Sequence, residues 1–255
     1  MTSPPVALSV AGSDPSGGAG IAADLATFAA LGAHGTAAVT AVTAQNTVGV
    51  QGIHPIPADF VARQLDSVLD DLPVAAVKTG MLANRDIIAV VGDYAAAGRL
   101  PNLVVDPVMV SSTGNRLLES EAETAYLELL GHATVATPNA REAMVLREVS
   151  DLGEPSDLAA LCPGSMVITG EASAIDFVFH DGGWLELSAE VIDTDNDHGT
   201  GCTFSAAVAA SLAARMAPMD AIKAAKGFVR KRIERSAEWG LGAGRGPVAH
   251  LMGPE

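Results

Sequence analysis

The stretch His198-Gly199-Thr200-Gly201-Cys202-Thr203 leads directly into the apolar segment 204–214. Its two glycines and two threonines open what the Ala-rich composition predicts to be a buried helix. The first turn of a helix leaves backbone N–H groups without partners, and glycine lets an anion approach them closely. We therefore interpret residues 199–202 as a phosphate-binding loop. The alternative is a tight turn before a core helix.

A second glycine-rich segment, Gly12-Ser13-Asp14-Pro15-Ser16-Gly17-Gly18-Ala19-Gly20, favours the phosphate interpretation. It joins a predicted strand to a predicted helix, which is an arrangement that cradles phosphates in α/β proteins. Gly18-Ala19-Gly20 also begins a match to the dinucleotide-binding fingerprint. That fingerprint needs an acidic residue about 20 positions later, and the segment 40–50 contains no Asp or Glu. The sequence therefore argues against a nicotinamide or flavin cofactor.

The net charge of −15 over 255 residues excludes a basic surface for nucleic acid or an anionic membrane. A bound phosphate would have to be held by backbone amides and a metal ion. No apolar run is long enough to predict a membrane span, and the first residues lack the basic start of a signal peptide. Cys162 and Cys202 form no metal-binding spacing. We expect a cytoplasmic protein that binds neither nucleic acid nor membrane.

Short Val/Ala/Ile runs alternate with longer helical patterns, which predicts an α/β fold with a mostly parallel sheet. We expect strands at 6–11, 36–44, 74–78, 102–105, 133–136 and 165–169, and helices at 20–31, 57–70, 84–98, 119–130, 139–148, 200–214 and 218–238. Asp181-Gly182-Gly183 lies between two apolar runs and predicts an antiparallel hairpin at the sheet edge. No linker or repeat divides the chain, so we expect one domain over 1–255.

Polar residues follow the predicted strands where each strand ends, and parallel strands bring those ends to one crevice. They are Asp14, Gln45, Asn46, Thr79, Asp106 and Asn139. Asn139 and Glu142 are three positions apart and so share one helical face. Together with Asp106 they predict a Mg²⁺ site for phosphoryl transfer. The alternative for Asn139 and Glu142 is a helix cap with its acidic partner.

Six segments follow one another along nearly the whole chain: 11–21 with Asp24, Ala44-Gln45-Asn46-Thr47, Lys78-Thr79-Gly80-Met81-Leu82, Asp106-Pro107-Val108-Met109, Thr137-Pro138-Asn139 with Glu142, and the loop 199–202. In this order they resemble the hydroxymethylpyrimidine/phosphomethylpyrimidine kinases of thiamine biosynthesis, members of the ribokinase-like superfamily. The resemblance implies a three-layer α/β/α fold and a homodimer. It also implies transfer of the γ-phosphate of MgATP to a primary hydroxyl, and then a second transfer that gives the pyrophosphate.

The resemblance also implies roles for individual residues. The pyrimidine would be bound by Gly12, Asp24, Gln45, Met81 and Val108. ATP and its phosphates would be bound by Asn139 and Thr169, and the metal by Asp106 and Glu142. The catalytic set would be Gly199, Thr200 and Gly201 as the anion hole, with Cys202 in the position of the base.

Residue chemistry agrees with three of these roles. Gln45 carries both a donor and an acceptor for an aminopyrimidine edge, and Met81 and Val108 offer apolar faces to its ring. A thiol at a helix N-terminus, such as that of Cys202, can have a lowered pKa and act as a base. The alternatives are a loop amide for Gln45, core residues for Met81 and Val108, and a packing residue for Cys202.

The chain departs from the family pattern at three places. Thr169-Gly170-Glu171-Ala172 stands where the family has Lys-Gly-Gly-His, so a lysine directed at the phosphates is missing. The segment between Asn139 and Thr169 is short, and Asp197 replaces a threonine. These departures leave two alternative functions open: a pyridoxal/pyridoxine kinase, and a pyrimidine-binding protein with weakened catalysis.

Overall fold

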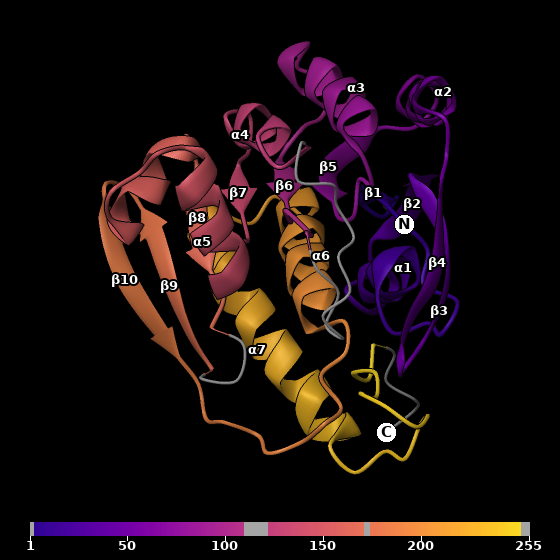
Figure 1. Ribbon diagram of the computed structural model, residues 1–255, viewed down its shortest axis with the longest axis vertical. Coiled ribbons are helices and arrows are strands. Elements are labelled where there is room, and N and C mark those ends of the chain that lie inside the picture. The colour runs from indigo at the N-terminus through magenta and orange to yellow at the C-terminus, as the bar shows by residue number, and fades with distance from the viewer. Residues whose placement is uncertain (1–2, 110–121, 171–173, 251–255) are drawn as a thin grey trace.

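The computed structural model describes residues 3–109, 122–170 and 174–250, and its centre is an eight-stranded sheet (Figure 1). The strand order is β10-β9-β8-β7-β6-β5-β1-β2, with all neighbours parallel from β8 to β2. The strands are β1 (Val6–Ala11), β2 (His34–Val39), β5 (Val74–Thr79), β6 (Leu103–Val105), β7 (Val135–Ala136), β8 (Ser165–Ile168), β9 (Ile175–His180) and β10 (Gly183–Ser188).

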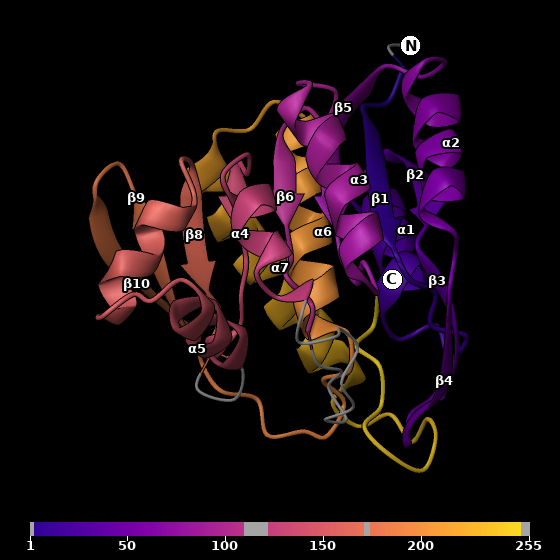
Figure 2. The same ribbon diagram turned by 45° about the horizontal axis from the view of Figure 1, so that its top comes forward.

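Helices cover both faces of this sheet (Figures 1 and 2). One layer holds α2 (Ala58–Leu69), α3 (Arg85–Ala96), α4 (Ala125–Leu130), α5 (Ala140–Val149) and the 3₁₀ helix η2 (Pro155–Leu161). The other layer holds α1 (Gly20–Ala30), α6 (Thr200–Ala213) and α7 (Pro218–Ser236). Among the described residues, no helix combines the length and apolar character needed to cross a bilayer.

The strand sequences explain why two layers form. Successive side chains of a strand point to opposite faces, so a strand covered on both sides is apolar throughout. In β1, Leu8 and Val10 belong to the core under α2–α5, whereas Ala7 belongs to the core under α1, α6 and α7. All three side chains are fully buried. The predicted three-layer α/β/α fold with a mostly parallel sheet is confirmed.

The predicted edge hairpin is also confirmed. β9 pairs antiparallel with β8 and with β10, and Gly183 lies opposite His180. Asp181 and Gly182 have φ of 49° and 81°, so both adopt the left-handed conformation that a tight two-residue hairpin turn requires.

The prediction of one strand over 36–44 is wrong. The chain breaks at Thr40, between β2 and a separate strand β3 (Ala41–Asn46). Thr40 is fully buried, its N–H donates to the Ala11 carbonyl, and its hydroxyl donates to the Met81 carbonyl at 2.6 Å. These bonds turn the chain away from the main sheet.

β3 pairs antiparallel with β4 (Gly49–Pro55) in a two-stranded sheet, and β4 was not predicted. The Asn46 side-chain oxygen accepts hydrogen bonds from the N–H groups of Val48 and Gly49, which closes the turn. An Asn three residues before a Gly is the sequence signal for this turn.

Two other boundaries differ from the prediction. The helix expected at 119–130 covers only Ala125–Leu130 within the described residues, and residues 119–121 lie outside them. The strand expected at 133–136 is the two-residue β7. The remaining predicted helices agree with the structure to within one or two residues.

A buried ion pair joins the sheet to α1. Lys78 on β5 and Asp24 on α1 have fully buried side chains, and Lys78 Nζ lies 2.9 and 3.0 Å from the two Asp24 oxygens. The Ser9 hydroxyl donates to Asp24 at 2.5 Å. This pair therefore fixes the position of α1 against the sheet, because charged hydrogen bonds add to the apolar contact.

Removing one partner alone would leave an uncompensated charge in the core. We expect Lys78→Met to lower the free energy of unfolding by about 3–5 kcal/mol. Adding Asp24→Asn to Lys78→Met should recover more than half of that loss, because no buried charge then lacks a partner. Urea unfolding of the parent, the single and the double variant measures both effects. A double variant as unstable as Lys78→Met would contradict this explanation.

Candidate functional site

The candidate site lies at the carboxyl ends of β1, β5 and β6. The strand order reverses beside β1, because β2 lies on one side of it and β5 on the other. Such a reversal opens a crevice at the carboxyl edge of a parallel sheet, where ligands bind. Gly12 follows β1, Met81 follows β5 and Asp106 follows β6, so three predicted site residues lie at this edge of the sheet.

The two glycine-rich loops contact each other directly. Gly199 is the N-cap of α6 with φ 82°, and a Cβ there would overlap the carbonyl oxygen of Gly18. A Cβ at Gly20, where φ is 57°, would overlap the carbonyl oxygen of Gly12. Glycine is required at these two positions because of both close approach and backbone conformation.

The start of α6 is open to a ligand. Thr200, Gly201 and Cys202 all keep some exposure, and nothing lies within 4 Å of the position a Cβ would take on Gly201. The Thr200 hydroxyl and N–H both donate to the Asp197 carbonyl, so this residue shapes the loop. The geometry is that of a helix N-terminus accessible to an anion.

Asp14 joins the two loops. One carboxylate oxygen accepts bonds from the N–H and hydroxyl of Ser16, and the other accepts from the Ala19 N–H and contacts His198 Nε2 at 2.8 Å. Burial would raise the pKa of Asp14, but the bonds from His198 and Ser16 outweigh it and lower the pKa. The aspartate therefore stays ionised and ties the first glycine loop to the residue preceding the second.

Residues 243–250 form hydrogen bonds with the residues of the candidate site. His198 donates its N–H to the Gly246 carbonyl and accepts from the Val248 N–H. His250 Nε2 contacts the carbonyl of Gly18 at 3.0 Å. At the tip of the β3–β4 hairpin, the Thr47 hydroxyl accepts from the N–H groups of residues 243 and 244 at 3.2 Å. Residues 243–250 thus contact the hairpin and both glycine loops.

Lys78 is the centre of a charged cluster beneath the α6 N-terminus. Besides Asp24, its ammonium lies 3.9 Å from Asp106, whose carboxylate accepts a bond from Ser205 on α6. Burial alone would lower the pKa of Lys78, but Asp24, Cys202 and Asp106 together raise it. Burial raises the pKa of Asp106 to about 6, against the effects of Lys78 and Ser205.

The expected lowering of the Cys202 pKa is not what the structure shows. Burial, with the carboxylates of Asp106 and Asp24, raises the pKa of this thiol to about 12, although Lys78 and a backbone bond from Gly20 oppose the rise. Burial is the largest of these effects. Cys202 is therefore a thiol at neutral pH.

The structure describes all of the predicted pyrimidine-binding residues. A Cβ at Gly12 would overlap the Met81 methyl, so these two residues touch, and Val108 lies half-buried two residues after Asp106. Gln45 lies half-buried on β3, where its oxygen is 3.4 Å from the Thr43 hydroxyl.

Asp24 is also among the predicted pyrimidine-binding residues. Its carboxylate is fully buried and held by Lys78 and Ser9.

Asn139 and Glu142, which were predicted to bind phosphate and metal, form a capping box at the start of α5. Asn139 accepts bonds from the N–H groups of Arg141 and Glu142, and Glu142 accepts from the Asn139 N–H at 2.9 Å. The other Glu142 oxygen accepts from the Met109 N–H at 3.3 Å. The cap alternative for this pair is therefore present in the structure. Thr169 lies beside it, because its N–H donates to the Pro138 carbonyl.

Sequence reasoning assigned no role to Lys78, although it quoted the residue within a motif. The missed signal is a lone lysine in the apolar run of β5, which can be buried only beside a carboxylate. Asp197 is one of the residues at which the chain departs from the family pattern. It pairs with Arg245, whose Nε lies 2.7 Å from the Asp197 carboxylate. Glu171 lies outside the described residues.

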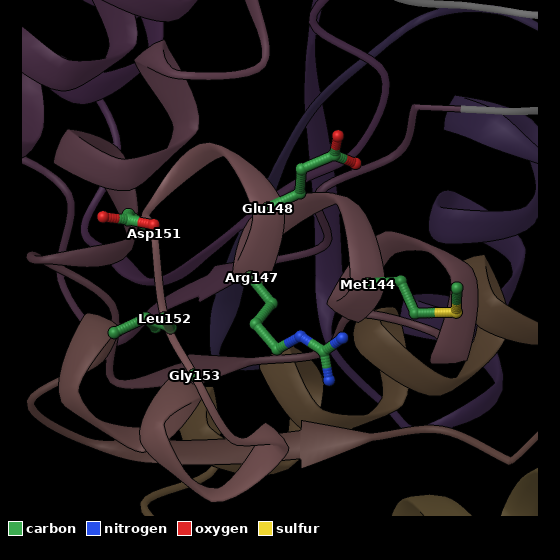
Figure 3. A pocket seen from close by; sticks show the side chains of 6 residues that line it. All are labelled: Met144, Arg147, Glu148, Asp151, Leu152 and Gly153. Atoms are coloured by element: carbon green, nitrogen blue, oxygen red, sulfur yellow. The ribbon is translucent and has the colours of Figure 1, made fainter.

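A hollow elsewhere on the surface is not part of this site. This pocket has a volume of about 350 Å³ and lies at the C-terminal half of α5 and the turn after it, and Figure 3 shows the residues that line it. Its lining consists of Met144, Arg147, Glu148, Asp151, Leu152 and Gly153.

Comparison with known proteins agrees with this arrangement. The family model of phosphomethylpyrimidine kinase matches residues 14–249. The chain is 42% identical to a hydroxymethylpyrimidine/phosphomethylpyrimidine kinase of Rhizobium meliloti, over 96% of this chain and 97% of that protein.

Two solved structures are similar as well. One is an ADP complex of Bacillus subtilis pyridoxal kinase, with a TM-score of 0.85, 38% identity, and coverage of 96% of this chain and 97% of that one. The other is a phosphomethylpyrimidine kinase from Clostridium difficile, with a TM-score of 0.76, 32% identity, and coverage of 89% and 99%. The family model and these relatives match nearly the whole chain. The chain belongs to the phosphomethylpyrimidine kinase family.

Proposed function

We propose that this protein transfers the γ-phosphate of ATP to the hydroxymethyl group of 4-amino-5-hydroxymethyl-2-methylpyrimidine, and then phosphorylates the monophosphate to the pyrophosphate for thiamine biosynthesis. The observation that carries the proposal is the contact between the two glycine-rich loops, where Gly199 at the open start of α6 meets Gly18, while Gly12 and Met81 touch after β1 and β5. Relatives of nearly the same length that are named for this reaction support it.

The pyrimidine would lie between Met81 and Val108, with Gln45 at its polar edge. Apolar side chains cover a flat ring, and one amide fixes its orientation through a donor and an acceptor. The hydroxymethyl arm would then point towards the loop 199–202. There the backbone N–H groups and the helix dipole would stabilise the negative charge that develops on the transferred phosphoryl group.

Mg²⁺ would enter with ATP, and Asp106 is the residue suited to hold it. Magnesium in phosphoryl-transfer sites commonly takes one or two protein carboxylates together with phosphate oxygens and water. Asp106, with its pKa of about 6, is ionised at neutral pH. Glu142 is already occupied as a cap, so it would act by keeping the Asn139 turn in place. Within the described ranges, no three His, Cys, Asp or Glu side chains gather as a metal cluster.

A homodimer of single-domain subunits in the cytoplasm is part of the proposal. The β3–β4 hairpin exposes Val42, Val48 and Ile53, which supports an apolar contact between subunits.

Pyridoxal kinase is the second candidate, favoured by the likeness to the Bacillus subtilis enzyme. Both substrates are flat rings with a CH₂OH arm. We expect ADP release at saturating MgATP to be faster with hydroxymethylpyrimidine than with pyridoxine. Faster release with pyridoxine would select the second candidate, and tight pyrimidine binding without turnover would identify a catalytically weakened binding protein.

Gln45 provides a test of ring recognition. We expect Gln45→Ala to weaken pyrimidine binding by about 1–3 kcal/mol, because polar groups of the ring would be buried without partners. Calorimetric titration with the pyrimidine measures this loss. Gln51→Ala, on the exposed face of the same hairpin, is the matched control and should bind normally. Unchanged affinity in Gln45→Ala would remove the residue from the site.

Cys202 is proposed as the proton acceptor in the first transfer. Because the pKa of its thiol is about 12, the thiolate fraction should rise about tenfold for each pH unit between 7 and 9. The first transfer should rise in parallel, since the alcohol must lose a proton.

The second acceptor is a phosphate monoester with a pKa of about 6, already a dianion, so the second transfer should stay flat with pH. Single-turnover rates for both acceptors measure this. Cys202→Ala should lose roughly 10²–10⁴-fold in the first transfer only. A first transfer that does not change with pH, or equal losses in both steps, would refute the base role.

A further inference from the structure

Lys226 on α7 is bonded to the connection between β8 and β9. Its ammonium donates to the Ala174 carbonyl at 2.9 Å and to Asp176 at 2.7 Å. The second Asp176 oxygen accepts from the Gly170 N–H at 3.1 Å. Lys226 and Asp176 therefore hold Gly170 and Ala174 through hydrogen bonds.

Most of this contact is buried. The Lys226 and Asp176 side chains are 15% and 10% exposed, whereas Arg230, one helical turn further along α7, pairs with a Glu190 that is 81% exposed. Ion pairs in water contribute little, while a shielded and hydrogen-bonded pair fixes its partners in position.

The backbone at Ala174 is unfavourable for a residue with a side chain. Its φ is 53°, in the left-handed region that non-glycine residues rarely adopt. The bond from Lys226 and a second one, from the Ala189 N–H, hold its carbonyl. Such a conformation persists only where its surroundings over-determine it.

The same bonds reach the predicted ATP-binding residues. Gly170 directly follows Thr169, which is bonded to the Pro138 carbonyl next to Asn139. A continuous series of contacts thus runs from α7 through Asp176 to the Thr169–Asn139 pair. In the sequence, this is where the family's Lys-Gly-Gly is absent.

We propose that Lys226 and Asp176 are positioning residues for the adenine nucleotide, which replace a direct lysine–phosphate contact by holding Thr169 and Gly170 in place. This inference rests on the proposed phosphotransfer function. It assigns to α7 a part in nucleotide affinity and none in pyrimidine affinity.

The test compares Lys226→Met, Lys226→Arg and the matched control Arg230→Met. Lys226→Met should weaken ADP binding and raise the KM for ATP about tenfold, with the KM for pyrimidine unchanged. Lys226→Arg keeps the charge and should restore most of the affinity, and Arg230→Met should behave as the parent. If Lys226→Met does not fold, Asp176→Asn, which keeps the shape and weakens the pair, should still raise the KM for ATP.

Each result is decisive. Parent-like ATP affinity in a folded Lys226→Met or Asp176→Asn protein overturns the inference, and so does an equal loss of ATP and pyrimidine affinity, which indicates general loosening. ADP titration of the parent separates the two proposals. A parent that binds ADP and shows the Lys226 effect without phosphorylating pyrimidine contradicts only the proposed function. A parent that binds no ADP contradicts both.

Discussion

The bond between the ammonium of Lys78 and the carboxylate of Asp24 is the constraint on which this site depends. It places one positive charge in a chain of net charge −15, at the strand end where Asp106 and Cys202 also lie. Without it, two carboxylates would share a buried space without a cation, at a cost of several kcal/mol. The buried acidity of this cluster is tolerated because a lysine from β5 compensates it.

The same ion pair is related to the small size of the residues in the two glycine-rich loops. Gly12, Gly20 and Gly199 allow the backbones of the two loops to touch, and contact between backbones gives little apolar burial. The loops are held in position by charged hydrogen bonds instead of by large packed side chains. These bonds are the Lys78–Asp24 pair and the Asp14–His198 contact. The loops are thus held in place by backbone contacts and by charged hydrogen bonds.

Much of this arrangement could be predicted from the sequence, and the failures have identifiable causes. Alternating apolar runs predicted the layers because burial sets the periodicity of strands and helices. The prediction of one strand through Thr40 was wrong. The buried Thr40 hydroxyl donates to the carbonyl of Met81, which is distant in the sequence, and the chain bends there. The prediction of a lowered Cys202 pKa was wrong because that pKa depends first on burial and then on Asp106 and Asp24, none of which local sequence reveals. Local patterns predict elements, whereas charges across elements decide protonation.

The segment 243–250 has a consequence for how the site comes into being. Thr47 and Ala243 are 196 positions apart, and Gly18 and His250 are 232 positions apart. Contacts of such sequence separation close the largest loops a chain has, and they form slowly compared with helices and local strand pairs. During synthesis the glycine loop at 12–20 and the β3–β4 hairpin leave the ribosome long before the segment that joins them. The contacts of residues 243–250 can therefore join this glycine loop to the hairpin only after nearly the whole chain has been made.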